Sequence, residues 1–66
     1  MAESTIERLT RTHRDNPEAI FSLFTLAGHV VSGRIGAITD TVTLAAGKEV
    51  AEVPVDRIEA FSYRPL

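Results

Sequence analysis

The stretch GHVVSGRIGAITDTVTL, residues 28–44, decides the fold. It opens at a glycine turn and continues as a strand with two alternating faces, one formed by Val31, Gly33, Ile35 and Ala37 and the other by Val30, Ser32, Arg34, Gly36 and Ile38. A glycine inside a strand marks a bend, a bulge or a close approach of another backbone. Gly33 and Gly36 therefore predict a sharply curved strand, as in a small closed barrel. Thr39-Asp40 then turns the chain into a second strand, residues 41–45, which completes a bent hairpin.

A short helix is predicted upstream of this hairpin. Ser4-Thr5-Ile6-Glu7 has the pattern of a capping box, and Asn16-Pro17 closes the helix after about His13 or Arg14. Ile6, Leu9 and His13 form a narrow apolar stripe, so we expect the helix to lie on a surface. Arg8, Arg11 and Arg14 form a second row, which is either a solvated charged face or a strip that faces phosphate.

Three further strands complete the predicted domain. Residues 19–27 are apolar on both faces, which is typical of a strand that is covered on both sides. A turn at residues 46–49 leads to a strand at 50–53, which Pro54 ends because proline cannot donate to a ladder. After a turn at 55–57, the last strand alternates Ile58, Ala60 and Ser62 with Glu59, Phe61 and Tyr63. We predict one domain over residues 1–66, with a helix and turn at 1–16 and five strands at 18–63.

Composition narrows the classes of function. A chain of 66 residues with no cysteine and no Cys/His cluster has neither a disulfide nor a structural zinc, so self-association is the expected extra support. No metal or other cofactor is expected. A net charge of −2 argues against strong non-specific nucleic-acid binding, and no DNA partner is expected. No apolar run is long enough for a membrane span, so we expect a cytoplasmic, soluble protein without a membrane partner. His13 and His29 lie on different elements and no nucleophile has a partner, so we expect no catalytic residues and no enzyme.

The order of these patterns resembles the Sm-like family (LSm and Hfq proteins). An apolar strand ends at Gly28, a second glycine follows at Gly33, and a short turn leads to an alternating strand that ends at Leu44. Residues 53–58, VPVDRI, stand where the family has its second, shorter signature, and the resemblance spans about residues 4–63. It implies a mainly β fold, in which an N-terminal helix precedes a strongly bent five-stranded antiparallel SH3-like barrel, the Sm fold. It also implies a homo-oligomeric ring of six or seven subunits that binds single-stranded RNA as an RNA chaperone or riboregulator. In such rings, the fourth strand pairs with the fifth strand of the next subunit.

The resemblance also implies two RNA sites. One lies on the pore face, where the matching positions are Thr39, Thr41, Asp56 and Arg57; Thr41 stands at the family's stacking position and Thr39 at its usual Asp. The other lies on the opposite face, where the matching positions are Phe24, Gly28, His29 and Ser32. Phe24 is otherwise a residue of the core or of a subunit interface, and His29 an exposed turn residue.

Two other functions remain open at this point. The excess of acidic over basic residues, together with pore-face positions that offer no stacking face at Thr41, favours a ring that acts as a structural or protein-interaction module with little RNA affinity. An unrelated SH3-like barrel, monomeric or dimeric, that binds a peptide through its loops is the third reading.

Overall fold

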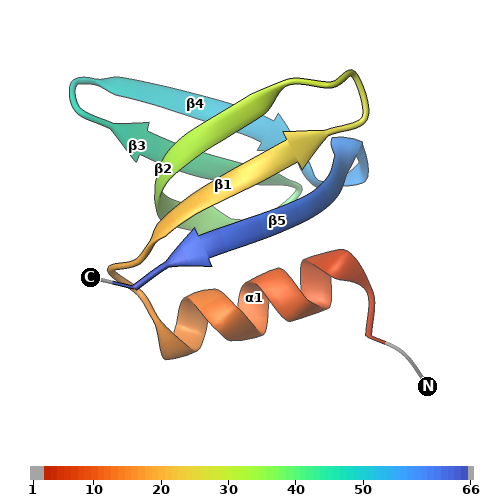
Figure 1. Ribbon diagram of the computed structural model, residues 1–66, viewed down its shortest axis with the longest axis horizontal. Coiled ribbons are helices and arrows are strands. Elements are labelled where there is room, and N and C mark those ends of the chain that lie inside the picture. The colour runs from red at the N-terminus through yellow and green to blue at the C-terminus, as the bar shows by residue number, and fades with distance from the viewer. Residues whose placement is uncertain (1–2, 66) are drawn as a thin grey trace.

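A computed structural model describes residues 3–65, which form an N-terminal helix followed by one antiparallel sheet of five strands (Figure 1). The elements are α1 (Thr5–Asp15), β1 (Ile20–Thr25), β2 (Val30–Ile38), β3 (Thr41–Ala46), β4 (Glu49–Pro54), the 3-10 turn η1 (Val55–Arg57) and β5 (Ile58–Arg64). The predicted mainly β class and the order of one helix and five strands are confirmed. The strand order is β4-β3-β2-β1-β5, so β4 and β5 form the two edges. Within residues 3–65, the sheet does not close into a barrel.

The helix has the predicted capping box at its start. The backbone N–H of Glu7 donates to Ser4 Oγ at 3.2 Å, and the Ser4 N–H donates back to Glu7 Oε1 at 3.4 Å. At the other end, Asn16 caps α1, and its side-chain amide donates to the carbonyl of Thr12 at 3.2 Å. The helix therefore ends at Asp15, one residue beyond the predicted range.

The apolar stripe of α1 fixes the helix to the sheet. Leu9 is fully buried, Ile6 packs against the core, and the His13 ring meets the Phe21 ring edge-on with centroids 6.0 Å apart. Figure 1 shows α1 running alongside β5, with which it is in contact. The narrow stripe thus covers one side of the bent sheet, while the opposite side of the helix stays exposed, as predicted for a surface helix.

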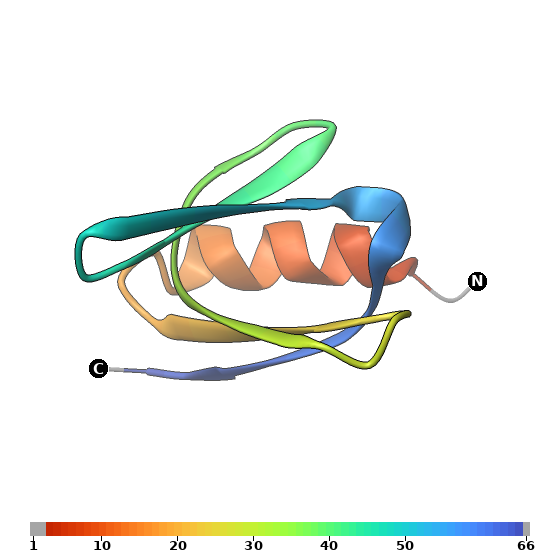
Figure 2. The ribbon, with the colours of Figure 1, turned by 90° about the horizontal axis from the view of Figure 1, so that it is seen from above.

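The bend of β2 divides the sheet into two leaves, β5 and β1 with the start of β2, and β3 and β4 with its end (Figure 2). At Gly33 the backbone of β3 comes so close that an added Cβ would lie 2.6 Å from the Ala45 carbonyl oxygen. At Gly36 the β2–β3 register shifts, because Ile35 pairs with Leu44 and Ala37 with Thr43. The two glycines therefore have the predicted roles, a close approach at one and a bulge at the other.

The bulge at Gly36 corrects the predicted faces of β2. Ile35 is buried, but Ala37 is exposed and Ile38 packs against the core. The prediction that Ala37 shares a face with Ile35 is wrong, because the extra residue reverses the alternation beyond it.

A second bulge corrects the predicted faces of β5. Thr25 pairs with Ile58 and Phe24 with Ala60, so Glu59 is the extra residue. Ile58 and Phe61 consequently both pack against the core, whereas Ala60 and Ser62 are exposed. The predicted grouping of Ile58 with Ala60 and Ser62 is therefore wrong.

The core lies between the two leaves and α1. Its buried residues are Leu9, Ala19, Phe21, Leu23, Ile35, Val42, Leu44 and Val53. Among residues 3–65, no buried side chain is polar or charged. Polar groups are therefore available for binding on the outer face of the sheet and at its turns, which is where the predicted site residues lie.

Candidate functional site

The four predicted pore residues come together at one end of the sheet. Thr41 pairs with Pro54, directly before η1, and the Val55 N–H donates to the Asp40 carbonyl at 3.1 Å, which ties the β2–β3 turn to η1. Thr39 closes this turn by donating its N–H to the Thr41 carbonyl at 2.9 Å. Thr39, Asp56 and Arg57 are exposed and Thr41 is half-buried. The fold therefore brings Thr39, Thr41, Asp56 and Arg57 into one group.

This pore group has limited chemistry for RNA. It offers two hydroxyls, one carboxylate and one guanidinium, and none of its four side chains is aromatic. Asp56 and Arg57 are neighbours with opposite charges, so the group has no net charge to attract phosphate. Among these four side chains, only the Arg57 guanidinium has a planar group on which a base can stack.

Phe24 and Ser32 lie on the outer face of the sheet, the face directed away from the core. Phe24 pairs with Val30, and its side chain is 39% exposed. Ser32 follows Val30 by two residues, so it lies on the same face and is diagonal to Phe24. The structure therefore places Phe24 outside the core, with its ring accessible at the end of β1.

Gly28 and His29 lie in the turn between β1 and β2. The Thr25 N–H donates to the His29 carbonyl at 2.9 Å, and the His29 N–H donates to Thr25 Oγ1 at 3.1 Å. Gly28 has a φ of +87°, which favours glycine. His29 is exposed. The turn thus places both residues beyond the end of the strand that carries Phe24, rather than on the sheet face itself.

The two predicted groups adjoin through η1. The Leu26 N–H, in the β1–β2 turn, donates to the Arg57 carbonyl at 2.9 Å. The β2–β3 turn contacts the same short helix through Val55. The short element η1 is therefore hydrogen-bonded to both turns, and Figure 2 shows η1 between them.

The outer face also carries polar residues that the sequence analysis did not assign to a site. Ser22 pairs with Ser32 on one side and with Ser62 on the other, and the Ser22 and Ser32 hydroxyl oxygens are 2.9 Å apart. We name Ser62, Ser22 and Ser32 the serine row. Towards the β1–β2 turn, the next residues on this face are Ala60, Phe24 and Val30. In the opposite direction they are Arg64, its partner Ile20, and Arg34, which follows the partner of Phe21.

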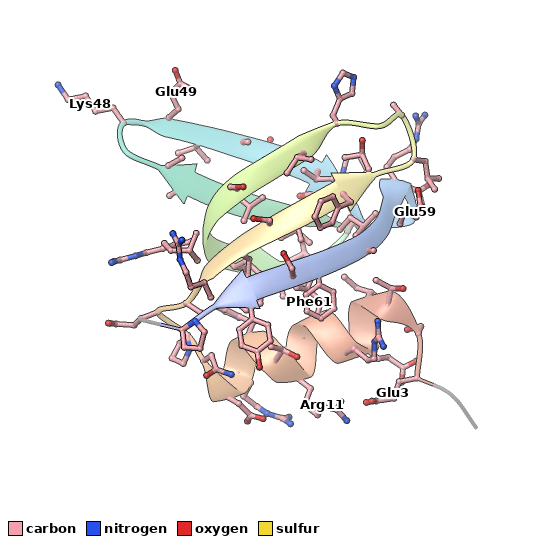
Figure 3. All side chains as sticks on the ribbon, viewed as in Figure 1. Glu3, Arg11, Lys48, Glu49, Glu59 and Phe61 are labelled. Carbon is pink, nitrogen blue, oxygen red and sulfur yellow. The ribbon has the colours of Figure 1, made fainter. Side chains whose placement is uncertain are left out.

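The three arginines in the row on α1 contact other side chains of the same chain. Arg11 forms an ion pair with Glu3 at 2.6 Å, and the two lie side by side below the helix in Figure 3. Arg14 lies 3.9 Å from Asp15, and the Arg8 guanidinium lies over the Phe61 ring, 5.9 Å from its centroid. Exposed ion pairs of this kind contribute little to stability, but they reduce the positive potential of the row. These contacts favour the solvated charged face over the phosphate-facing strip.

The described residues contain no cluster of metal ligands. In the described part of the chain, no three His, Asp or Glu side chains gather where they could hold a metal ion. Likewise, none of its helices is long and apolar enough to cross a membrane. Comparison of the chain with protein-family models, curated proteins and solved structures finds no match in any of the three.

Proposed function

We propose that the chain is a subunit of a homo-oligomeric Sm-like ring that binds single-stranded RNA and acts as an RNA chaperone or riboregulator. The observation that carries this proposal is the strand order β4-β3-β2-β1-β5, which leaves β4 and β5 at the two edges of a strongly bent sheet. In the family that the sequence resembles, the fourth strand pairs with the fifth strand of the next subunit. In this proposal, the same pairing completes the SH3-like barrel of the Sm fold and protects both edges.

The exposed apolar side chains support assembly through these edges. Val50 on β4 is 67% exposed, and Tyr63 on β5 is 45% exposed. Both residues expose apolar side-chain surface to water, and covering that surface with a neighbouring subunit is favourable. A ring therefore gives both edge strands a partner and covers apolar surface at the same time.

We assign the RNA to the Phe24 face rather than to the pore group. Phe24 offers an accessible ring for stacking a base, and Ser32 offers a hydroxyl for a base edge on the same face. The pore group lacks an aromatic ring, and its carboxylate at Asp56 repels phosphate. Purines stack more extensively than pyrimidines, so the proposal predicts a preference for oligo-A over oligo-U.

The test measures fluorescence anisotropy of labelled oligo-A and oligo-U over a salt series. Phe24→Ala is expected to weaken oligo-A binding by about 1–3 kcal/mol, the usual contribution of one stacked base. Leu26→Ala is the matched control. Leu26 is also an exposed apolar residue (62% exposed), but it lies in the β1–β2 turn and not on the face of the sheet. Arg57→Ala is expected to leave oligo-A binding unchanged.

Two results would contradict this assignment. A preference for oligo-U that disappears in Arg57→Ala would move the site to the pore group. No binding to either RNA at low salt would favour the second candidate, a ring that serves as a structural or protein-interaction module. The net charge of −2 and the neutral pore group are the observations that favour that candidate. A stable monomer in native mass spectrometry would exclude both rings and favour a monomeric, peptide-binding barrel.

A further inference from the structure

The outer face of the sheet is hollowed on both sides of Ile20. One hollow, of about 530 Å³, is lined by Ile20, Ser32, Gly33, Arg34, Ala45, Ala46 and Gly47. The other, of about 300 Å³, is lined by Ile20, Ser22, Ser32, Ser62, Tyr63 and Arg64. Ile20 and Ser32 belong to both linings, so the two hollows adjoin. Together they extend over β5, β1 and β2 and continue to the β3–β4 turn.

The polar groups that line these hollows are donors suited to an anion. They include the three hydroxyls of the serine row and two guanidiniums, those of Arg34 and Arg64. No carboxylate of the described chain lines either hollow, although acidic residues outnumber basic ones in the sequence. Within residues 3–65, neither Arg34 nor Arg64 forms an ion pair. Among the described residues, no carboxylate therefore competes with a ligand for the donors of these two guanidiniums.

We propose that Arg34, Arg64 and the serine row form a strip that binds the phosphates of a single-stranded RNA whose base stacks on Phe24. This inference rests on the proposed RNA function, and it adds the part of the site that holds the backbone. Guanidiniums donate to phosphate oxygens in pairs, and hydroxyls donate to them singly. Ile20, between the two arginines, gives the strip an apolar floor that does not compete for these donors.

The register of the strands sets the direction of the RNA. Phe24, Ser22 and Ile20 succeed one another on the outward face of β1, and Ile20 is four residues from Phe24, or about 13 Å along the strand. The stacked base and the phosphate at the arginines are therefore at opposite ends of a site that follows β1. Pairing of β5 with another subunit would use backbone groups at its edge and leave the outward side chains of the serine row at the surface.

The first test replaces each arginine by glutamine, which removes the charge but keeps a long polar side chain. Arg34→Gln and Arg64→Gln are each expected to weaken oligo-A binding roughly two- to fivefold at low salt, the range of exposed ionic contacts. Each should also reduce the slope of log affinity against log salt by about 0.7, because the protein then neutralises one phosphate fewer on the single strand. Arg14→Gln is the matched control, because Arg14 is exposed on α1 and lines neither hollow.

The second test removes a hydroxyl without changing charge. Ser22→Ala deletes the middle hydroxyl of the serine row and is expected to weaken oligo-A binding while the salt slope stays as in the wild type. Thermal unfolding of every variant at one protein concentration checks that the fold is kept. Arg34 and Arg64 are exposed, and substitutions at exposed positions usually change stability very little.

The outcomes separate this inference from the proposed function. If wild-type protein binds oligo-A and Phe24→Ala weakens it, but Arg34→Gln and Arg64→Gln both behave as Arg14→Gln does, the phosphate strip is wrong and the RNA function stands. If pyrophosphate displaces oligo-A at equal concentration of phosphate groups, the strip serves a free phosphate ligand and the inference is overturned. If wild-type protein binds oligo-U but not oligo-A, the phosphate strip is wrong and the RNA site moves to the pore group; if it binds neither RNA at low salt, both proposals fail.

Discussion

At the scale of single residues, the bend of the sheet depends on the missing side chain of Gly33. The Ala45 carbonyl of β3 occupies the space that a Cβ at this position would need. Gly36, three residues further along the same strand, is different, because an added Cβ there would lie 3.9 Å from the nearest atom, the Thr43 carbonyl oxygen. The two glycines of one strand therefore differ in how far the fold requires them.

Alanine at each position tests this difference. Gly33→Ala is expected to lower the free energy of unfolding by about 1–3 kcal/mol, because backbone atoms must move to relieve a 2.6 Å contact. Gly36→Ala is expected to be neutral or to stabilise by up to about 1 kcal/mol, since it restricts the unfolded chain without a clash. Urea unfolding at matched protein concentration measures both. Equal destabilisation of the two variants would refute the close approach at Gly33.

At the scale of elements, α1 depends on the sheet. An isolated helix of this length is marginal in water even with good caps. Its capping box fixes where it begins, but Leu9 is the residue of α1 that is fully buried. Docking through this side chain, together with the contacts of Ile6 and His13, is therefore what holds the helix against the sheet.

Removing the Leu9 side chain tests how much of the stability comes from docking. Leu9→Ala is expected to lower the free energy of unfolding by about 2–5 kcal/mol, the usual effect of truncating a large buried side chain. Arg14→Ala, an exposed change on the same helix, should stay within about 0.5 kcal/mol of wild type. Circular dichroism during urea unfolding measures both. A small effect of Leu9→Ala would mean that the helix contributes little to the fold.

At the scale of the whole molecule, the open sheet leaves two strands with a free edge. β4 and β5 are far apart in strand order, so one chain offers two different edges, and head-to-tail pairing of copies can close a ring. Any such assembly binds only folded chains, so it raises the unfolding temperature as protein concentration increases.

Val50 is the position at which assembly is tested most directly. Val50→Asp places a charge on β4 where the proposed ring has its interface, and it is expected to shift native mass spectra from ring to monomer. The same variant should lose the concentration dependence of the unfolding temperature. Leu26→Asp adds the same charge at a similarly exposed position outside the edge strands and should leave the ring intact. Identical spectra for both variants would argue against the edge as the interface.

Local features of the fold could be predicted from the sequence, whereas pairings between distant segments could not. The capping box at Ser4 and Glu7 and the roles of Gly33 and Gly36 depend on neighbouring residues, and the structure has them as predicted. The predicted faces of β2 and β5 are wrong beyond Gly36 and at Ile58, because a bulge adds one residue that no alternation pattern reveals.

The candidate site could likewise be predicted from the sequence only in part. The resemblance predicts that the β2–β3 turn and η1 meet, and they do, through Val55 and Asp40. The serine row could not be predicted, although Ser32 is one of the predicted site residues. Its alignment depends on how β1 pairs with β5, and the paired residues of these strands lie about 40 positions apart in the chain. Only the pairing of Ser22 with both neighbours reveals that these hydroxyls stand in line.

The pairing of β1 with β5 also sets an order of events during synthesis. The ribosome delivers β5 after all four other strands, so β1 leaves the exit tunnel with one edge that has to wait for its partner. During that interval, the nascent chain can complete the hairpins of β1, β2, β3 and β4 in succession, since each joins neighbours in sequence. Because β5 runs antiparallel to β1, its first residues pair with the Thr25 and Phe24 end of β1, and the Ile20 end is the last part of that edge to be covered.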